Sequence, residues 1–277
     1  MQHTLSHILL KDTRLNQAFS YKELISAIKE SKNTAPGLDT ICYEMFKHMS
    51  VKSLEIMLRL FNKIWFKGKI PPAWLHSIIV PIPKANKPSQ MHSSYESYRP
   101  ISLTSNVSKL FEKMIVCRLK WFLEYYNILT FTQSGFRQRR NTTDHILRLH
   151  DIIQKYLTNK HNVLAVFIDI EKAYDMVNKN VLLLKLLKFG ITGRISVQFI
   201  SSFLSNRTFQ VRVGSTLSMT KLLENGTPQG SVLSPVLFSL MIKDLPNKIT
   251  SPSALDADDL CFWESGSDVT FLNQLCR

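Results

Sequence analysis

Three aspartates fall within four positions of an otherwise apolar stretch, ALDADDLCFW at 254–263. The apolar and aromatic neighbours of Asp256, Asp258 and Asp259 are typical of a buried strand or hairpin, where an unpaired charge costs free energy. A tight surface turn would explain the acids, because Asp favours turns. A bound cation would explain them equally, because hard cations take oxygen ligands. These ten residues leave both explanations open.

A further carboxylate, Asp169, lies near the C-terminal end of VLAVFIDI at 163–170, which is apolar on both faces and predicts a central strand. If this strand neighbours the hairpin, Asp169, Asp258 and Asp259 converge on one site. Converging carboxylates suit Mg²⁺, and two such ions about 3.5–4 Å apart would activate an attacking oxygen and stabilise a leaving one. The alternative makes Asp169 a helix cap and 258–259 a turn. The acids alone do not decide.

The formal net charge of +14, from 35 Lys and Arg against 21 Asp and Glu, favours a polyanionic partner over a merely solvated surface. No apolar run reaches the length of a membrane-spanning helix, and the N-terminus lacks a signal-peptide pattern. The four cysteines have no paired spacing and are predicted to be buried free thiols. We therefore expect an intracellular protein without a membrane partner, in either nucleus or cytoplasm.

Hydrophobic periodicity and turn residues predict the elements that must position these acids. Helices are expected over about 18–31 and 43–66, from the YRPISL segment to about 126, from a cap at Thr142 or Thr143, and over about 179–189, 195–204 and 231–243. Strands are expected at 77–84, at 163–170, at TFQVRV and in the acidic hairpin. Helices and strands mix without regular βαβ alternation, so the predicted fold class is α+β.

Three motifs fit a known order. FIDIEKAYD (167–175), GTPQGSVLSP (226–235) and ADD (257–259) have the order and approximate spacing of polymerase palm motifs A, B and C. The supporting blocks are APGLD (35–39), WLHSIIVPIPK (74–84), YRPISLTSNVSKLFEKMI (98–115) and QSGFR (133–137). With them the chain, from about residue 33 to 263, resembles reverse transcriptases of non-LTR (LINE-type) retrotransposons. The resemblance implies a right-hand polymerase fold, with an N-terminal helical extension at 1–32, a fingers-like region at 33–160 and a palm at 161–277.

The resemblance also implies which residues handle metal and template. Asp169 and Asp258 would bind the catalytic ions, Mg²⁺ or alternatively Mn²⁺, with Asp259 beside them and the Ile170 carbonyl as an extra ligand. The template-binding residues would be Gly135, Phe136 and Arg137, with the arginine on phosphate and the aromatic ring able to stack.

Five further positions would bind the incoming nucleotide. Lys84 and Arg99 would hold the triphosphate, where cations neutralise charge on the leaving pyrophosphate. Tyr174 would lie beneath the sugar and clash with a ribonucleotide 2′-hydroxyl. Gln229 would contact the nucleotide, and Gly230 would allow close backbone approach to it. The alternatives are core packing for Tyr174 and Gln229 and a solvated loop charge for Lys84 and Arg99.

The sequence departs from the family pattern in three ways. Asp256 stands where Tyr or Phe is usual. In a regular strand it would share a face with Asp258 and repel it, so we expect Asp256 to impair the chemistry. Asn178 stands where Trp is frequent. The sequence ends at Arg277, shortly after the hairpin, so the expectation is fingers plus an incomplete palm, with the thumb and the upstream endonuclease of a full-length element absent.

The sequence thus predicts an RNA-directed DNA polymerase that adds deoxynucleotides to a primer 3′ end. Its expected partners are an RNA template, a DNA primer and deoxynucleoside triphosphates. One alternative is a non-catalytic, nucleic-acid-binding remnant of a retroelement, which Asp256 and the absent thumb favour. A metal-dependent nuclease would explain the acids and the charge but not PQGSVLSP or YRPISL.

Overall fold

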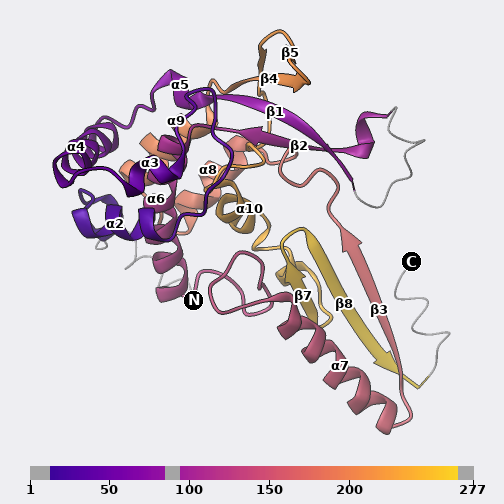
Figure 1. Ribbon diagram of the computed structural model, residues 1–277. Coiled ribbons are helices and arrows are strands. Elements are labelled where there is room, and N and C mark those ends of the chain that lie inside the picture. Colours follow the sequence, from indigo (N-terminus) through magenta and orange to yellow (C-terminus); the bar gives the residue numbers. More distant parts are fainter. Residues whose placement is uncertain (1–12, 85–93, 268–277) are drawn as a thin grey trace. The chain divides into compact units, whose positions relative to one another are not determined.

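A computed structural model describes residues 13–84 and 94–267 (Figure 1). The chain divides into two compact units, each built from two chain segments: unit 1 comprises 1–122 and 174–234, and unit 2 comprises 123–173 and 235–277. The start of the predicted N-terminal extension and the last residues of the predicted palm lie outside the described residues. Both units mix helices and strands, which confirms the α+β fold class.

Unit 1 contains a sheet in which strands distant in sequence are neighbours. β1 (His76–Pro83) pairs antiparallel with β2 (Tyr98–Leu103) and parallel with β4 (Thr208–Val213). Two short strands, β5 (Thr216–Leu217) and β6 (Lys221–Leu222), pair antiparallel with β4. The path β2-β1-β4-β5 therefore joins the YRPISL segment, for which the sequence pattern predicted no strand, to the predicted TFQVRV strand through β1.

Most helical segments belong to unit 1. They are η1 (Thr13–Asn16), α2 (Tyr21–Lys29), α3 (Tyr43–Lys47), α4 (Val51–Lys67), α5 (Pro72–Leu75), η3 (Tyr95–Ser97), α6 (Asn106–Tyr125, whose last turn enters unit 2), α8 (Lys179–Lys188), the π-helical η4 (Arg194–Ile200) and α9 (Ser201–Leu204). The prediction of one helix over 43–66 is wrong. Ser50 is extended and its side chain accepts from the Ser53 backbone N–H, so a new helix starts after it.

An aromatic cluster forms the centre of the unit 1 core. Its fully buried members are Phe61, Trp65, Phe111, Phe199 and Phe203. Trp65 of α4 lies 5.8 Å from Phe199 between ring centroids, and Phe111 of α6 lies 4.9 Å from Phe61. Large aromatic side chains dominate core energetics through the area that they bury, so these rings hold α4, α6 and η4 together.

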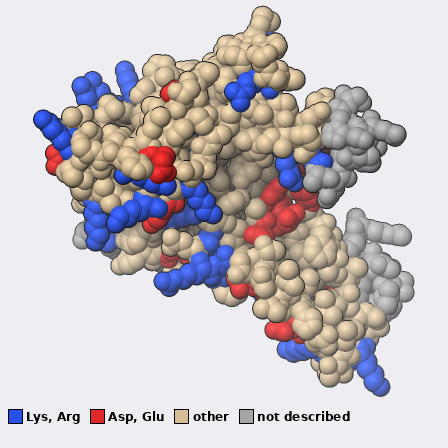
Figure 2. All heavy atoms as spheres, in the orientation of Figure 1, with Lys and Arg blue, Asp and Glu red and all other residues tan. Residues whose placement is uncertain are grey.

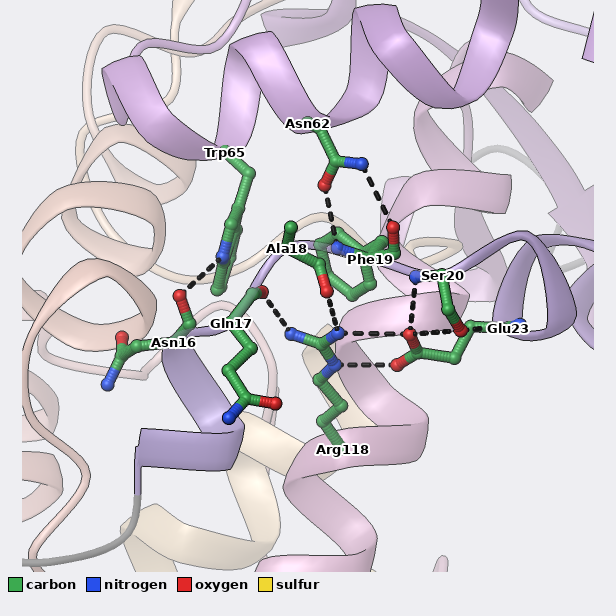
Figure 3. A network of polar contacts seen from close by, with 9 residues as sticks. All are labelled: Asn16, Gln17, Ala18, Phe19, Ser20, Glu23, Asn62, Trp65 and Arg118. Carbon is green, nitrogen blue, oxygen red and sulfur yellow. Dashed lines mark hydrogen bonds and ion pairs between the residues drawn. The ribbon is translucent and has the colours of Figure 1, made fainter. Parts of the chain in front are cut away.

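Arg118 ties α6 to the segment before α2 (Figure 3). Its guanidinium donates to both carboxylate oxygens of Glu23, at 2.6 and 3.0 Å, and to the backbone carbonyls of Gln17 and Ala18. It also lies 4.0 Å from the centre of the Phe19 ring. A planar guanidinium suits such a combination of forked hydrogen bonds and ring stacking.

Unit 2 is a three-stranded antiparallel sheet with helices. β3 (Asn162–Asp169) pairs with β8 (Asp259–Gly266), which pairs with β7 (Ser253–Asp256). Its helical segments include α7 (Thr142–Thr158), α10 (Ser234–Ile242, whose first residue belongs to unit 1) and η5 (Pro246–Lys248).

Two details of unit 2 correct the sequence predictions. β3 lies at the edge of the described sheet, not in its centre, and Phe167 is 72% exposed. An apolar run on both faces shows that a strand can be buried but not how many strands flank it. The cap of α7 is Asn141, not Thr142 or Thr143, because Asn141 and Asp144 form a reciprocal capping box.

The described cysteines, Cys42, Cys117 and Cys261, are free thiols, but the prediction that they are buried is wrong, since Cys117 is exposed and the other two are partly exposed. Among the residues that the structure describes, no helix is both long enough and apolar enough to cross a bilayer.

Candidate active site

The acidic motif forms the turn of a β-hairpin. Asp256 ends β7, Asp259 begins β8, and the two face each other in the ladder. Ala257 and Asp258 make the turn, and Ala257 has a positive φ of 54°. The expectation that Asp256 and Asp258 share one face of a regular strand is therefore wrong, because the chain reverses between them.

Asp169 lies beside this hairpin. The register of β3 against β8 places Asp169 directly opposite Asp259, and directly opposed Cβ atoms in such a ladder are about 4.5–5.5 Å apart. The backbone N–H of Ile170 donates to the Asp258 carbonyl at 3.2 Å, which extends the pairing to the turn. The structure therefore brings Asp169, Asp258 and Asp259 together, and acidic side chains gather on the face drawn in Figure 2.

The carboxylates repel one another. Partial burial raises the pKa of the Asp259 carboxyl, and the charges of Asp258, Asp169 and Asp256 raise it further. Within 13–84 and 94–267, the side chains of Asp169, Asp258 and Asp259 have no hydrogen-bond or ion-pair partner. A cation at this cluster would relieve that repulsion.

The cluster alone does not form a closed metal cage. In the described part of the chain, no group of three or more His, Cys, Asp and Glu side chains is placed to hold a metal ion. Mg²⁺ in nucleotide-handling sites is commonly held by one or two carboxylates together with phosphate oxygens and water. An ion at this cluster would therefore need further oxygen ligands, from water or from a bound phosphate.

One of the predicted template residues, Gly135, lies against the hairpin. A Cβ on Gly135 would come within 2.1 Å of the Ala257 backbone nitrogen, so only glycine fits there. The backbone N–H of Ser134 donates to the Leu255 carbonyl at 2.9 Å. Phe136 is on the surface with a φ of 62°.

Arg137 has protein partners. Its guanidinium forms a two-pronged ion pair with Glu124, at 2.8 and 2.6 Å, and donates to the carbonyls of Thr130 and Gln133. The side chain is 8% exposed. Contact with a phosphate would require this ion pair to open. By contrast, Arg139 in the same loop is exposed and has no hydrogen bond or ion pair to another described residue.

Asp256 has a partner of its own. Its Oδ2 accepts a hydrogen bond from the Thr142 hydroxyl at the first residue of α7. The N-terminus of a helix carries partial positive charge and stabilises a nearby carboxylate. Asp256 therefore joins the hairpin to α7.

Lys84 and Arg99 lie together in unit 1. Arg99 is opposite Ile82 in the β1–β2 register, and the Lys84 N–H donates to the Ser97 carbonyl at 2.9 Å, which continues the ladder. Side chains two positions apart in a strand share a face, so the two cations are diagonal neighbours. Neither has an acidic partner among the described residues.

The predicted nucleotide contacts Gln229 and Gly230 also lie in unit 1, docked on β2. The backbone N–H of Ser102 donates to the Gln229 carbonyl at 2.8 Å. Gly230 has a φ of 134°, and a Cβ there would come within 2.4 Å of the Ser102 carbonyl oxygen. Close approach to β2 is therefore a sufficient reason for glycine at 230.

Motifs A and B meet at Tyr174. Its carbonyl accepts from the Thr227 N–H at 2.9 Å, and the Val177 carbonyl accepts from the Gly226 N–H at 3.1 Å. The Tyr174 side chain is partly exposed. Asn178, where Trp was expected, caps α8, because its side chain accepts from two backbone N–H groups of the first turn.

Sequence reasoning missed Glu112. This residue of α6 is 1% exposed, and its carboxylate accepts from Ser108, Ser231, Val232 and Leu233. The available signal was a single acid inside the apolar LFEKMI run, where a charge must have partners.

The chain resembles known sequences over most of its length. Residues 82–270 match the family model described as reverse transcriptase (RNA-dependent DNA polymerase). Three proteins of Drosophila melanogaster are similar. The probable RNA-directed DNA polymerase from transposon BS is 36% identical over 81% of this chain and 24% of its own length. The probable RNA-directed DNA polymerase from transposon X-element is 33% identical over 84% of this chain and 26% of its own length. The RNA-directed DNA polymerase from mobile element jockey is 30% identical over 91% of this chain and 27% of its own length. The chain therefore spans about a quarter of the length of these relatives.

Proposed function

Because the chain belongs to the reverse transcriptase (RNA-dependent DNA polymerase) family, we propose that it catalyses RNA-directed DNA synthesis. The observation that carries the proposal is the register of β3 and β8. It places Asp169 opposite Asp259, beside Asp258, with no protein cation bound to them among the described residues. Such a cluster suits chemistry on phosphates, because its carboxylates could hold the metal ions that neutralise charge on the reacting oxygens.

The proposed reaction joins a deoxynucleotide to a primer. The primer 3′-oxygen forms a bond to the α-phosphorus as its proton passes to water, and the bond from that phosphorus to the bridging oxygen breaks so that pyrophosphate leaves. Bound Mg²⁺, or Mn²⁺, would neutralise the attacking and leaving oxygens. Asp169 and Asp258 would hold the ions, with Asp259 and the Ile170 carbonyl adjacent.

We assign the nucleotide contacts to unit 1 residues. Lys84 and Arg99 have no acidic partner among the described residues, so they are available to the triphosphate. Gln229 presents a partly exposed side chain from a backbone fixed on β2, next to Gly230. Tyr174 would exclude a ribonucleotide 2′-hydroxyl.

The expected partners are an RNA template, a DNA primer and deoxynucleoside triphosphates. Gly135, Phe136 and Arg137 would place the template, with Phe136 as the exposed ring. Thumb and endonuclease regions would belong to a longer protein, as the partial coverage of the relatives suggests. A non-catalytic, nucleic-acid-binding remnant is the second candidate, supported by Asp256 in place of an aromatic residue.

Primer extension on poly(rA)/oligo(dT) with Mg²⁺ tests the proposal. Asp169→Asn and Asp258→Asn should each lower the rate of the first addition by about a thousandfold, because several kcal/mol of charge stabilisation is lost. Asp151→Asn, at an exposed carboxylate of α7, is the matched control and should keep the rate. Extension that survives either active-site substitution would contradict the assigned roles, and binding without extension by the unchanged chain would favour the remnant.

A further inference from the structure

Glu112 is a buried carboxylate with an unusually complete set of donors. Its Oε2 accepts from the Ser231 hydroxyl and from the backbone N–H groups of Val232 and Leu233, the latter two at 3.0 and 3.4 Å. Its Oε1 accepts from the Ser108 hydroxyl, one turn earlier in α6, at 3.0 Å. Three of the four donors thus come from one short segment of motif B, 119 to 121 residues further along the chain.

Two buried cations of unit 1, Lys109 and Arg207, interact electrostatically with the Glu112 carboxylate. Burial lowers the pKa of Arg207 to about 10, and Glu112 opposes that shift. A buried charge is costly unless paired and hydrogen-bonded, so Glu112 is fixed in place by its surroundings and can in turn fix what it binds.

The segment from Gln229 to Leu233 contacts two other elements, β2 and α6, in addition to bonds within its own turn, where the Ser231 N–H and the Ser234 hydroxyl donate to the Pro228 carbonyl at 3.2 and 3.0 Å. Ser102 of β2 binds the Gln229 carbonyl, and Glu112 of α6 binds the chain from Ser231 onward. The residue between these anchors is Gly230, which has the widest backbone freedom. The bonds to the Pro228 carbonyl stay within the turn, so without the anchor on α6 the turn as a whole could tilt about Ser102 and carry Gln229 with it.

We propose that Glu112 is a positioning residue for the incoming nucleotide, acting by fixing the orientation of Gln229. The inference rests on the proposed function, since it assigns Gln229 to the deoxynucleoside triphosphate. Val232 and Leu233 also lie just before α10, where backbone N–H groups lack helical partners. A purely structural cap of α10 is therefore the competing explanation, and the two differ in what they predict for nucleotide use.

Two serine variants separate these explanations. Ser231→Ala removes a donor to Glu112 that belongs to motif B, whereas Ser108→Ala removes a donor to the same carboxylate that lies in α6. The Ser231 hydroxyl also accepts from the Leu233 and Ser234 N–H groups, so loss of this cap is measured separately as a loss of thermal stability. If Glu112 positions Gln229, Ser231→Ala raises the KM for dTTP severalfold and Ser108→Ala leaves it unchanged. Glu112→Gln, which keeps the shape but loses the charge, raises that KM about tenfold, because hydrogen bonds to a charged group are lost. In all three, kcat and the affinity for template–primer stay within about threefold of the unchanged chain.

The measurement is single-nucleotide extension of oligo(dT) on poly(rA) over a range of dTTP concentrations, with thermal unfolding of each variant alongside. Equal KM values for the two serine variants, or a loss confined to kcat, would overturn the inference even where Glu112→Gln fails to fold. If the unchanged chain adds no nucleotide, the proposed function fails for this chain. The Kd for dTTP on the template–primer complex then replaces KM, and a complex that binds no dTTP, or binds it equally in both serine variants, overturns the inference as well.

Discussion

At Asp256, the structure shows a stabilising contact where the sequence predicted only repulsion between neighbouring acids. As a sequence position it is an extra acid beside two others, and repulsion predicts impaired chemistry. In the structure it accepts a hydrogen bond from Thr142 at the positive end of α7 and lies across the ladder from Asp259. Its charge therefore has a stabilising partner that the local sequence does not reveal, because Thr142 is 114 residues away.

Stability measurements test this contact. Asp256→Ala and Thr142→Val should each lower the free energy of unfolding by about 1 kcal/mol, and the double variant should lose less than their sum, because both remove the same hydrogen bond. Urea unfolding of the four chains measures the coupling. Asp151→Ala, which removes an exposed charge from the same helix, should change little. Strictly additive losses would show that the two side chains act independently.

At the scale of elements, the sequence predicted the helices and strands that have a clear hydrophobic pattern within their own residues. The acidic hairpin and the β3 strand follow from apolar runs ending in acids, and the motif order implied that they are neighbours. The break between α3 and α4 was missed, because the apolar pattern continues across Ser50. The edge position of β3 and the role of Glu112 depend on pairing partners far away in sequence, which periodicity does not specify.

The Arg118–Glu23 ion pair is one of several contacts that attach the η1–α2 segment to α6. Burial alone would raise the pKa of Glu23, but hydrogen bonds from Arg118 and Ser20 outweigh it, and the pKa lies below the ordinary 4.5. A carboxyl with a lowered pKa in the folded state stabilises it above pH 4.5, and that contribution is lost as the pH falls through the folded value.

Arg118→Met should remove this pH dependence. The substitution keeps much of the packing on Phe19 but no charge, so unfolding near neutral pH should cost about 2 kcal/mol less, with solvent screening of the half-buried pair limiting the loss. The difference between the two chains should shrink as the pH falls below the ordinary value of 4.5 and through the lowered pKa of Glu23. Urea unfolding at several pH values measures it. A difference that is constant with pH would assign the effect of Arg118 to packing alone.

At the scale of the whole molecule, the net charge of +14 is the property that most affects binding of a polyanion. Figure 2 shows Lys and Arg side chains in several separate groups on the face that it draws, and Asp and Glu side chains in others. A basic surface binds nucleic acid largely by releasing counterions from phosphates, so the logarithm of the affinity should fall linearly with the logarithm of the salt concentration. The slope of this line depends on the number of Lys and Arg side chains that contact phosphate, so a single substitution can show whether one of them takes part.

Two arginines of one loop should contribute differently to this salt dependence. Arg139 is exposed and has no partner among the described residues, whereas Arg137 is neutralised by Glu124. For an RNA–DNA duplex, Arg139→Ala should therefore reduce the salt slope by about one, and Arg137→Ala by clearly less. Fluorescence anisotropy of a labelled duplex between about 50 and 200 mM salt measures both. The reverse order would show that the Arg137–Glu124 pair opens on binding and releases the arginine to a phosphate. Equal slopes for all three chains would place this loop outside the nucleic-acid interface.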